Sequence, residues 1–110
     1  MEENKKIIVT TANDIPGKKI KTVLGVVRGN TVRARNIGRD IAASLKNIIG
    51  GEIETYTELT SQSRDEAYNR MVNEAIKLGA DGVVAMRFTT ATVMQGAEEM
   101  LAFGTAVKFG

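Results

Sequence analysis

Three arginines and one aspartate stand within eight consecutive residues, the densest group of charged side chains in the sequence. They are Arg33, Arg35, Arg39 and Asp40. If this stretch begins as a strand, the first two arginines point to one side, and the third follows in the first turn of a helix. Guanidinium groups at a helix N-terminus can bind phosphate or carboxylate. Alternatively, the four side chains form salt bridges across a subunit interface, with Asp40 or the acidic C-terminal half as partner, and we favour this interpretation.

Metal ligation is restricted to carboxylates and thioethers, because the chain has no cysteine and no histidine. Soft and borderline metal ions prefer thiolate, thioether or imidazole ligands, whereas carboxylates suit hard ions. The candidate ligands are Asp81, Met94, Glu98, Glu99 and Met100. Adjacent glutamates point in different directions on a strand or a helix, so a solvated acidic turn is the simpler interpretation. We therefore expect no cofactor and discount metal binding as an intrinsic property of the chain.

Catalysis finds little support in the residue types present. Without cysteine or histidine, a nucleophilic thiol and a proton-transferring imidazole are both excluded. Proton transfer would fall to Asp, Glu, Lys or Tyr, and no two carboxylates stand in an apolar stretch that would tune them for it. The glycines match neither a dinucleotide-binding nor a P-loop spacing. An enzyme is therefore the least favoured class, and 5% aromatic residues without tryptophan make nucleic acid an unexpected partner.

The composition predicts a single globular domain that spans residues 1–110. Of these residues, 43% are apolar and 25% are charged, and one hydrophobic core commonly organises about 100 to 200 residues. No apolar run reaches the roughly 18 to 20 residues that a membrane span needs. We expect a cytoplasmic protein with no membrane partner.

The net charge of +2 is unevenly distributed along the chain. Residues 15–46 hold eight basic residues against one acid, whereas residues 47–110 hold five basic and nine acidic residues. Such a split favours either a basic face for an anionic partner or two surfaces of opposite sign that meet when identical subunits pack head to tail. We favour the second interpretation.

Alternating apolar residues predict four strands. They are residues 5–11, residues 20–34, residues 82–90 and residues 100–109. Within the second strand, Gly29 and Asn30 permit a hairpin turn or a bulge, and the sequence does not choose between them. In the third, Val84, Met86 and Phe88 are expected on one face. In the last, Ala102, Gly104 and Ala106 present a small-residue surface that another layer can approach closely.

Two helices are expected between the second and third strands. The first covers residues 36–49 and ends at two consecutive glycines. After an extended piece over residues 52–56, the second begins within residues 57–63, where Ser63 fits a capping box. It ends at Gly79, a position typical of a C′ glycine. Its buried stripe consists of Ala67, Met71, Ala75 and Leu78. These elements predict a layered α+β fold, a mainly antiparallel sheet with helices on one face.

Short motifs lie between and around these elements: Ile-Pro-Gly at 15–17, Arg-Asn-Ile-Gly-Arg-Asp-Ile at 35–41, Gly-Gly-Glu at 50–52, Leu-Gly-Ala-Asp at 78–81 and Gly-Thr-Ala-Val at 104–107. With these motifs the chain resembles the YbjQ-like family of small bacterial and archaeal proteins, and the segments at 35–41 and 50–52 are the most specific. The resemblance implies a β-α-β-β two-layer sandwich, dodecin-like, that assembles into a ring homo-oligomer, in particular a pentamer. It implies no known reaction.

The expected function is therefore a homo-oligomeric binding or assembly module, with a site for a small anion or a partner protein at the subunit junctions. The alternative is the heavy-metal-binding role that the family label suggests, carried by acidic residues or methionines.

Overall fold

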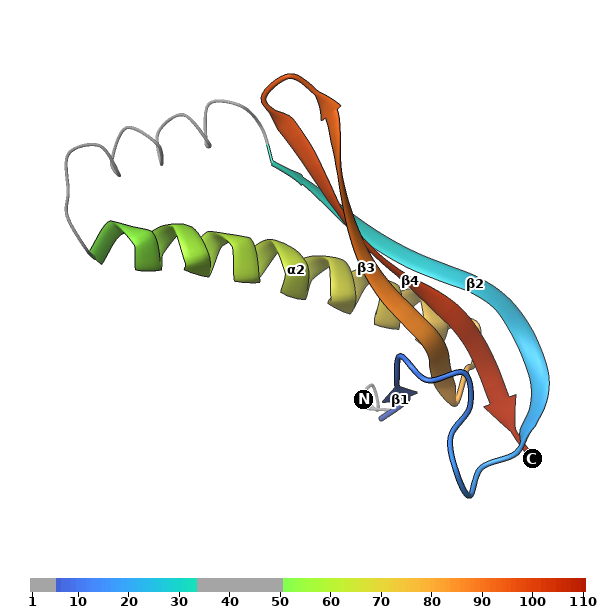
Figure 1. Ribbon diagram of the computed structural model, residues 1–110. Coiled ribbons are helices and arrows are strands. Elements are labelled where there is room, and N and C mark those ends of the chain that lie inside the picture. Colours follow the sequence, from blue (N-terminus) through green and yellow to red (C-terminus); the bar gives the residue numbers. More distant parts are fainter. Residues whose placement is uncertain (1–5, 34–50) are drawn as a thin grey trace.

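The computed structural model describes residues 6–33 and 51–110, and it describes side chains for residues 6–32 and 61–110. Figure 1 shows a long helix lying along one face of a strongly bent sheet. The elements are β1 (Ile8–Val9), β2 (Ile20–Arg33), α2 (Gly51–Lys77), β3 (Gly82–Met94) and β4 (Ala97–Phe109). The helix expected over residues 36–49 lies outside the described residues.

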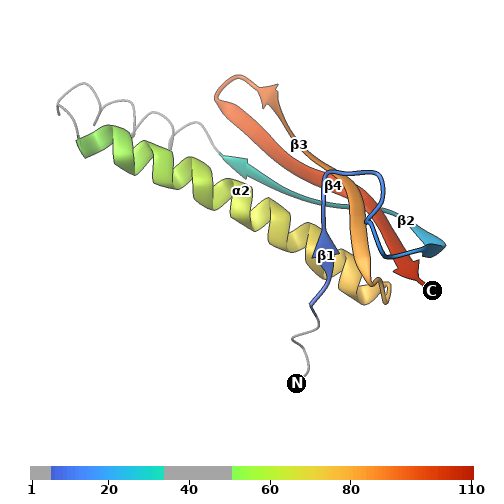
Figure 2. The same cartoon turned by 60° about the horizontal axis from the view of Figure 1, so that its bottom comes forward.

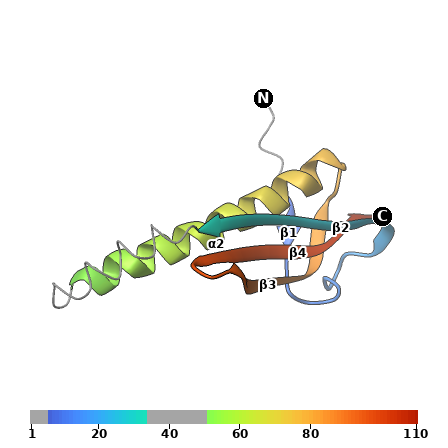
Figure 3. The ribbon, with the colours of Figure 1, turned by 90° about the horizontal axis from the view of Figure 1, so that it is seen from above.

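The sheet is mixed, with strand order β1-β3-β4-β2. β1 runs parallel to β3, and the longer pairs β3–β4 and β2–β4 are antiparallel. Figures 2 and 3 show α2 running beside β2 on one side of the sheet. The predicted α+β fold with a mainly antiparallel sheet and helical cover on one face is confirmed. Within the described ranges, no helix has the length and apolar character that crossing a membrane requires.

The helix α2 begins at Gly51, so the extended piece expected over residues 52–56 and the later helix start are both wrong. β-branched residues favoured a strand in this stretch. Two glutamates in the first turn, at positions 52 and 54, favour the helix because carboxylates stabilise its positive end. Ser63 is consequently not a cap. It is buried in the middle of α2, where its carbonyl oxygen accepts a hydrogen bond of 3.2 Å from the Thr31 hydroxyl.

The C-terminus of α2 is a Schellman motif. The Gly79 N–H donates to the carbonyl of Ile76, and the Ala80 N–H donates to the carbonyl of Ala75. Gly79 has a φ of 80°, a conformation that favours glycine, so the predicted C′ glycine is confirmed. The chain reverses here, which leaves Leu78 48% exposed and corrects its expected place in the buried stripe.

The core lies between the buried stripe of α2 and the small residues of the sheet. Ala67, Met71 and Ala75 are fully buried, as predicted. Ala102 and Ala106 of β4 are also fully buried and let the helix approach the sheet closely. The expected small-residue surface is therefore confirmed at these two alanines, whereas a Cβ atom at Gly104 would meet Val83 and Met86 of β3.

Helix and sheet approach each other closely at Gly29. A Cβ atom placed there would clash with both the carbonyl oxygen of Ala67 and the amide nitrogen of Met71. The register with β4 runs without interruption through Gly29 and Asn30. The prediction of a hairpin turn or a bulge at this dipeptide is therefore wrong. The glycine allows the helix to contact the strand, and the chain does not change direction here.

A bulge in β3 changes which side chains face the helix. Val84 pairs with Thr105 and Arg87 pairs with Phe103, so three steps along β3 match two along β4. Val84 and Arg87 therefore lie on the same face of the sheet. Ala85, inside the bulge, has a φ of 55°.

Because of the bulge, the side chains of β3 do not alternate between the two faces of the sheet as predicted. Phe88 pairs with Ala102 and lies on the face opposite to that of Val84, although both were expected on one face with Met86. Val84 is buried and Phe88 is 42% exposed. The Arg87 guanidinium donates a hydrogen bond of 2.8 Å to the Thr11 carbonyl and so fastens the loop after β1 to this bend.

Replacing Ala85 by glycine is expected to raise the free energy of unfolding by about 0.5 to 1 kcal/mol. A residue with a Cβ atom is disfavoured at positive φ, and glycine is not. The matched variant Ala85→Val should destabilise by at least about 1 kcal/mol, because a β-branched residue tolerates this conformation least. Urea unfolding of both variants checks the prediction. Equal midpoints for the two variants would contradict it.

β3 and β4 are joined by a two-residue hairpin loop, Gln95 and Gly96, with Gly96 at a φ of 83°. β4 therefore begins at Ala97, earlier than predicted. Glu98 and Glu99 lie in this strand and not in the turn expected for them.

Candidate functional site

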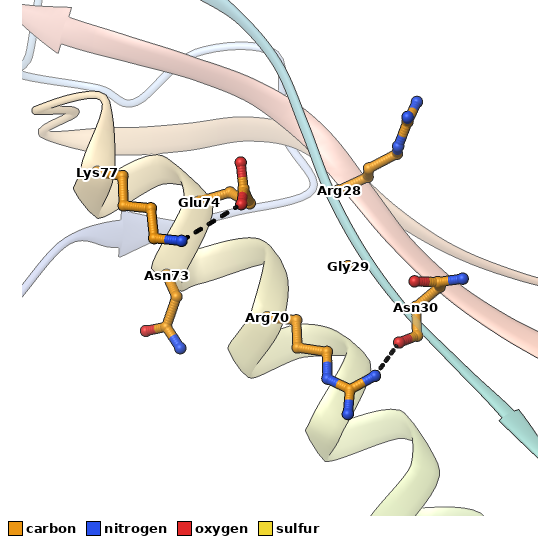
Figure 4. Close-up of a pocket in the computed structure, with 7 residues that line it drawn as sticks. All are labelled: Arg28, Gly29, Asn30, Arg70, Asn73, Glu74 and Lys77. Carbon is orange, nitrogen blue, oxygen red and sulfur yellow. Dashed lines mark hydrogen bonds and ion pairs between the residues drawn. The ribbon is translucent and has the colours of Figure 1, made fainter.

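A groove of about 320 Å³ lies between the free edge of β2 and the helix α2 (Figure 4). Its lining residues are Arg28, Gly29, Asn30, Arg70, Asn73, Glu74 and Lys77. We call it the β2–α2 groove.

The spacing of the lining residues explains how two distant segments build one site. Arg70, Asn73, Glu74 and Lys77 are three, four and seven residues apart, so they share one side of α2, next to its buried stripe. On β2, Gly29 brings this side of the helix close to the strand. Its neighbours Arg28 and Asn30 are both exposed. In Figure 4, Arg28 points away from the helix at the rim, whereas Arg70 extends toward Asn30.

Hydrogen bonds fix part of the lining in place. The Arg70 guanidinium donates to the backbone carbonyl of Asn30. The Asn30 side-chain amide donates to the Glu99 carboxylate at 2.9 Å. Lys77 Nζ lies 3.8 Å from Glu74 Oε2, and both side chains are largely exposed. Such an exposed pair contributes little to stability, so it can rearrange at small cost.

The lining is positively charged. It contains the cations Arg28, Arg70 and Lys77 and the carboxylate of Glu74, which leaves a formal net charge of +2. Two asparagine side chains add neutral hydrogen-bonding groups. The groove therefore has the chemistry of a site for a small anion.

The sequence did not reveal this groove. Four polar residues at helical spacing beside a buried stripe are typical of a solvated helix face. The signal that could have found the site is Gly29, which marks where helix and strand touch, but only the folded structure shows that α2 is the partner.

The arginine cluster predicted from the sequence lies mostly outside the described residues. This applies to Arg35, Arg39 and Asp40. Arg33 is the last residue of β2 and stands opposite Glu98 in the register with β4. The backbone thus places one arginine of the cluster beside an acidic residue of the C-terminal half. The ligand or interface role of the cluster stays a prediction.

The five candidate metal ligands do not form one site. The Asp81 carboxylate, at the start of β3, accepts a hydrogen bond of 3.0 Å from the Phe109 amide. Asp81 bonds through its backbone to Val107, nine residues along β4 from Glu98, or roughly 30 Å of strand. Glu98 and Glu99 are consecutive in β4 and so face opposite sides of the sheet, as expected. Met94 is 66% exposed, whereas Met100 packs against the core.

Comparison with known proteins relates nearly the whole chain to one family. Residues 7–110 match the YbjQ family model, described as "Putative heavy-metal-binding". A UPF0145 protein of Archaeoglobus fulgidus is 59% identical over 104 residues, covering 94% of this chain and 96% of the relative. A UPF0145 protein of Thermotoga maritima is 51% identical over 102 residues, covering 93% and 96%.

A solved structure shares the fold. It is a protein of unknown function from Pediococcus pentosaceus, assigned to the DUF74 family, with a TM-score of 0.61 and 19% sequence identity. The alignment covers 94% of this chain and 98% of that protein. At this identity the likeness supports the architecture alone.

The only soft donor atoms of this chain are the thioethers of its five methionines, because the sequence has no thiol and no imidazole. Across the described ranges, no three acidic side chains come together as a cluster that could hold an ion. The family match confirms the resemblance seen in the sequence: the chain belongs to the YbjQ family, and the two UPF0145 relatives are similar to it over nearly their whole length.

Proposed function

We propose that the protein is a cytoplasmic homo-oligomeric binding module, a ring of five subunits, that takes a small anion where two subunits meet. The number five comes from the family resemblance. The anion is suggested by the charge of the β2–α2 groove.

The assembly is supported by two long strands that have uncovered edges. β2 is an outer strand of 14 residues, and β3 has 13 residues, of which the short outer strand β1 covers only a part. β1 and the loop after it bond to β3 only as far as Arg87. Over the described residues, no other strand covers the outer edge of β2 or the rest of β3. Such edges pair readily with another chain.

Exposed apolar side chains on the same two strands support an interface. Val26 and Val32 of β2 are 72% and 53% exposed, and Met94 of β3 is 66% exposed. Apolar side chains gathered on unpaired strands are typical of surfaces that another subunit covers. Contact between the two different edges would be head to tail, the geometry that closes rings.

The anion site follows from where the β2–α2 groove lies. It runs along the outer edge of β2, so a subunit that paired with this edge would border the groove. The predicted arginine cluster also begins at the end of β2, with Arg33. A ligand at this edge would thus be close to a junction between subunits.

We expect light scattering behind a sizing column to give a discrete multiple of 11.9 kDa, and five subunits in particular. A head-to-tail contact between surfaces of opposite charge should weaken as salt screens it. Measurement at low and high salt therefore tests both the assembly and its electrostatic part. A monomer at both salt concentrations would contradict the proposal.

The variant Arg35→Ala separates the two roles of the arginine cluster. Dissociation of the oligomer supports an interface role. An intact oligomer that has lost stabilisation by added phosphate supports a ligand role, because a ligand raises native-state stability as RT ln(1 + [L]/Kd).

A further inference from the structure

We infer that the β2–α2 groove recognises the phosphate group of a small phosphate monoester. This inference rests on the proposed anion-binding function and names the class of ligand. It assigns the recognition to Arg70 and Lys77 of α2, with Arg28 at the rim and Glu74 as a competing carboxylate inside the groove.

Charge favours a phosphate monoester over a carboxylate. At pH 7 a phosphate monoester carries a charge of about −1.5 to −2 and offers three acceptor oxygens. The lining of the groove has a formal net charge of +2 when Arg28 at the rim is counted. A phosphate monoester matches this charge if the exposed Arg28 side chain turns toward the groove, whereas a single carboxylate would leave half of it uncompensated.

The hydrogen-bond donors are placed for a phosphate. Arg70 has five N–H donors, and its bond to the Asn30 carbonyl anchors the guanidinium between helix and strand. Its remaining N–H groups can bind phosphate oxygens in the bidentate manner typical of arginine. Lys77 stands two turns along the helix from Arg70, about 10 Å away on the same side of α2, so its long side chain must turn toward Arg70 to share one phosphate group.

The volume indicates more than an inorganic ion. About 320 Å³ lies at the lower end of the range found for small-molecule sites, about 300 to 1,000 Å³. A phosphate group fills only part of this space, which leaves room for a small organic group. The side-chain amide of Asn73 offers polar contacts for hydroxyl groups on it.

The Glu74 carboxylate competes with a bound anion for the Lys77 ammonium group. This carboxylate lies 3.8 Å from Lys77 Nζ, in the position of an anion that a ligand must displace from the lysine. Both partners are largely exposed, so the exchange costs little. Removing the charge of Glu74 should therefore strengthen binding, an effect that a general loss of structure would not produce.

The test is isothermal titration of the full chain with ribose 5-phosphate in phosphate-free buffer at low salt. We expect saturable binding of ribose 5-phosphate, no binding heat with ribose, and a lower affinity for inorganic phosphate than for the ester. Arg70→Gln should weaken binding by about tenfold or more, the size of one lost charge-assisted hydrogen bond. Glu74→Gln should strengthen binding severalfold.

Two exposed residues on the same helix supply charge-matched controls. Arg64→Gln removes the same charge as Arg70→Gln, and Asp65→Asn the same charge as Glu74→Gln, and neither residue lines the groove. We expect less than a twofold change for each. Equal effects of Arg64→Gln and Arg70→Gln would show attraction by overall charge and overturn the inference. The inference would also be overturned if the wild-type chain bound neither ribose 5-phosphate nor inorganic phosphate.

The native mass measured on the same samples separates this inference from the proposed function. If the chain is a monomer that binds ribose 5-phosphate through Arg70, the inferred ligand class is supported and the proposed site at a subunit junction is contradicted. If the chain is an oligomer that binds neither phosphate compound, the proposed assembly is supported and the inferred ligand class is contradicted.

Discussion

Replacing Gly29 by alanine is expected to destabilise the protein by at least about 3 kcal/mol, at the upper end of the cost of overpacking a core. The added methyl group would clash with two backbone atoms of α2, the carbonyl oxygen of Ala67 and the amide nitrogen of Met71. Backbone atoms cannot rotate away as a side chain does. The whole helix must therefore move off the sheet, which opens the core on both sides of the contact.

Thermal unfolding should show this loss as a decrease of roughly 12 to 24 °C in the Tm of Gly29→Ala. The matched control is Gly17→Ala. A Cβ atom at Gly17 meets nothing within 4 Å, so only the cost of its positive φ remains. A Tm for Gly29→Ala no lower than that of Gly17→Ala would contradict the close contact between α2 and β2.

Replacing Met71 by alanine is expected to cost about 3 kcal/mol, within the range found when large buried side chains are truncated. Met71 is fully buried and is among the largest side chains enclosed by the core. Truncation removes its contacts within the core cluster and leaves a cavity there.

The control for this substitution is Met94→Ala at the exposed end of β3. The Met94 side chain is 66% exposed, so its truncation should change the free energy of unfolding by less than about 0.5 kcal/mol. Urea unfolding measures both variants. A similar loss for the two methionines would mean that Met71 does not belong to the core.

The sequence predicted the architecture where local signals agree with the tertiary structure. The structure buries the alanine and methionine stripe of α2 and the alanines of β4, as their spacing predicted. It also places Gly79 at the positive φ expected of a C′ glycine. The predicted start of α2 was wrong because β-branched residues locally favour a strand, while the negative charges in the first turn of the helix favour a helix.

Two features escaped prediction because they depend on contacts between distant segments. The bulge at Ala85 inserts one residue into a strand whose alternation is otherwise regular, and the cause lies in its neighbours, the β1 loop and β4. The β2–α2 groove joins Arg28 to Lys77 across 49 residues of sequence. Periodicity along one element carries no information about which other element lies beside it.

The connection between β3 and β4 has a consequence for how the chain reaches its fold. Their two-residue loop makes this pair the most local contact in the sheet, and hairpins of this kind close in about 1 to 10 μs. β1 instead pairs with β3 across 74 residues, from Ile8 to Gly82. Because distant contacts incur the larger loss of chain entropy, we expect folding to begin at the hairpin and the first strand of the sequence to join the sheet last.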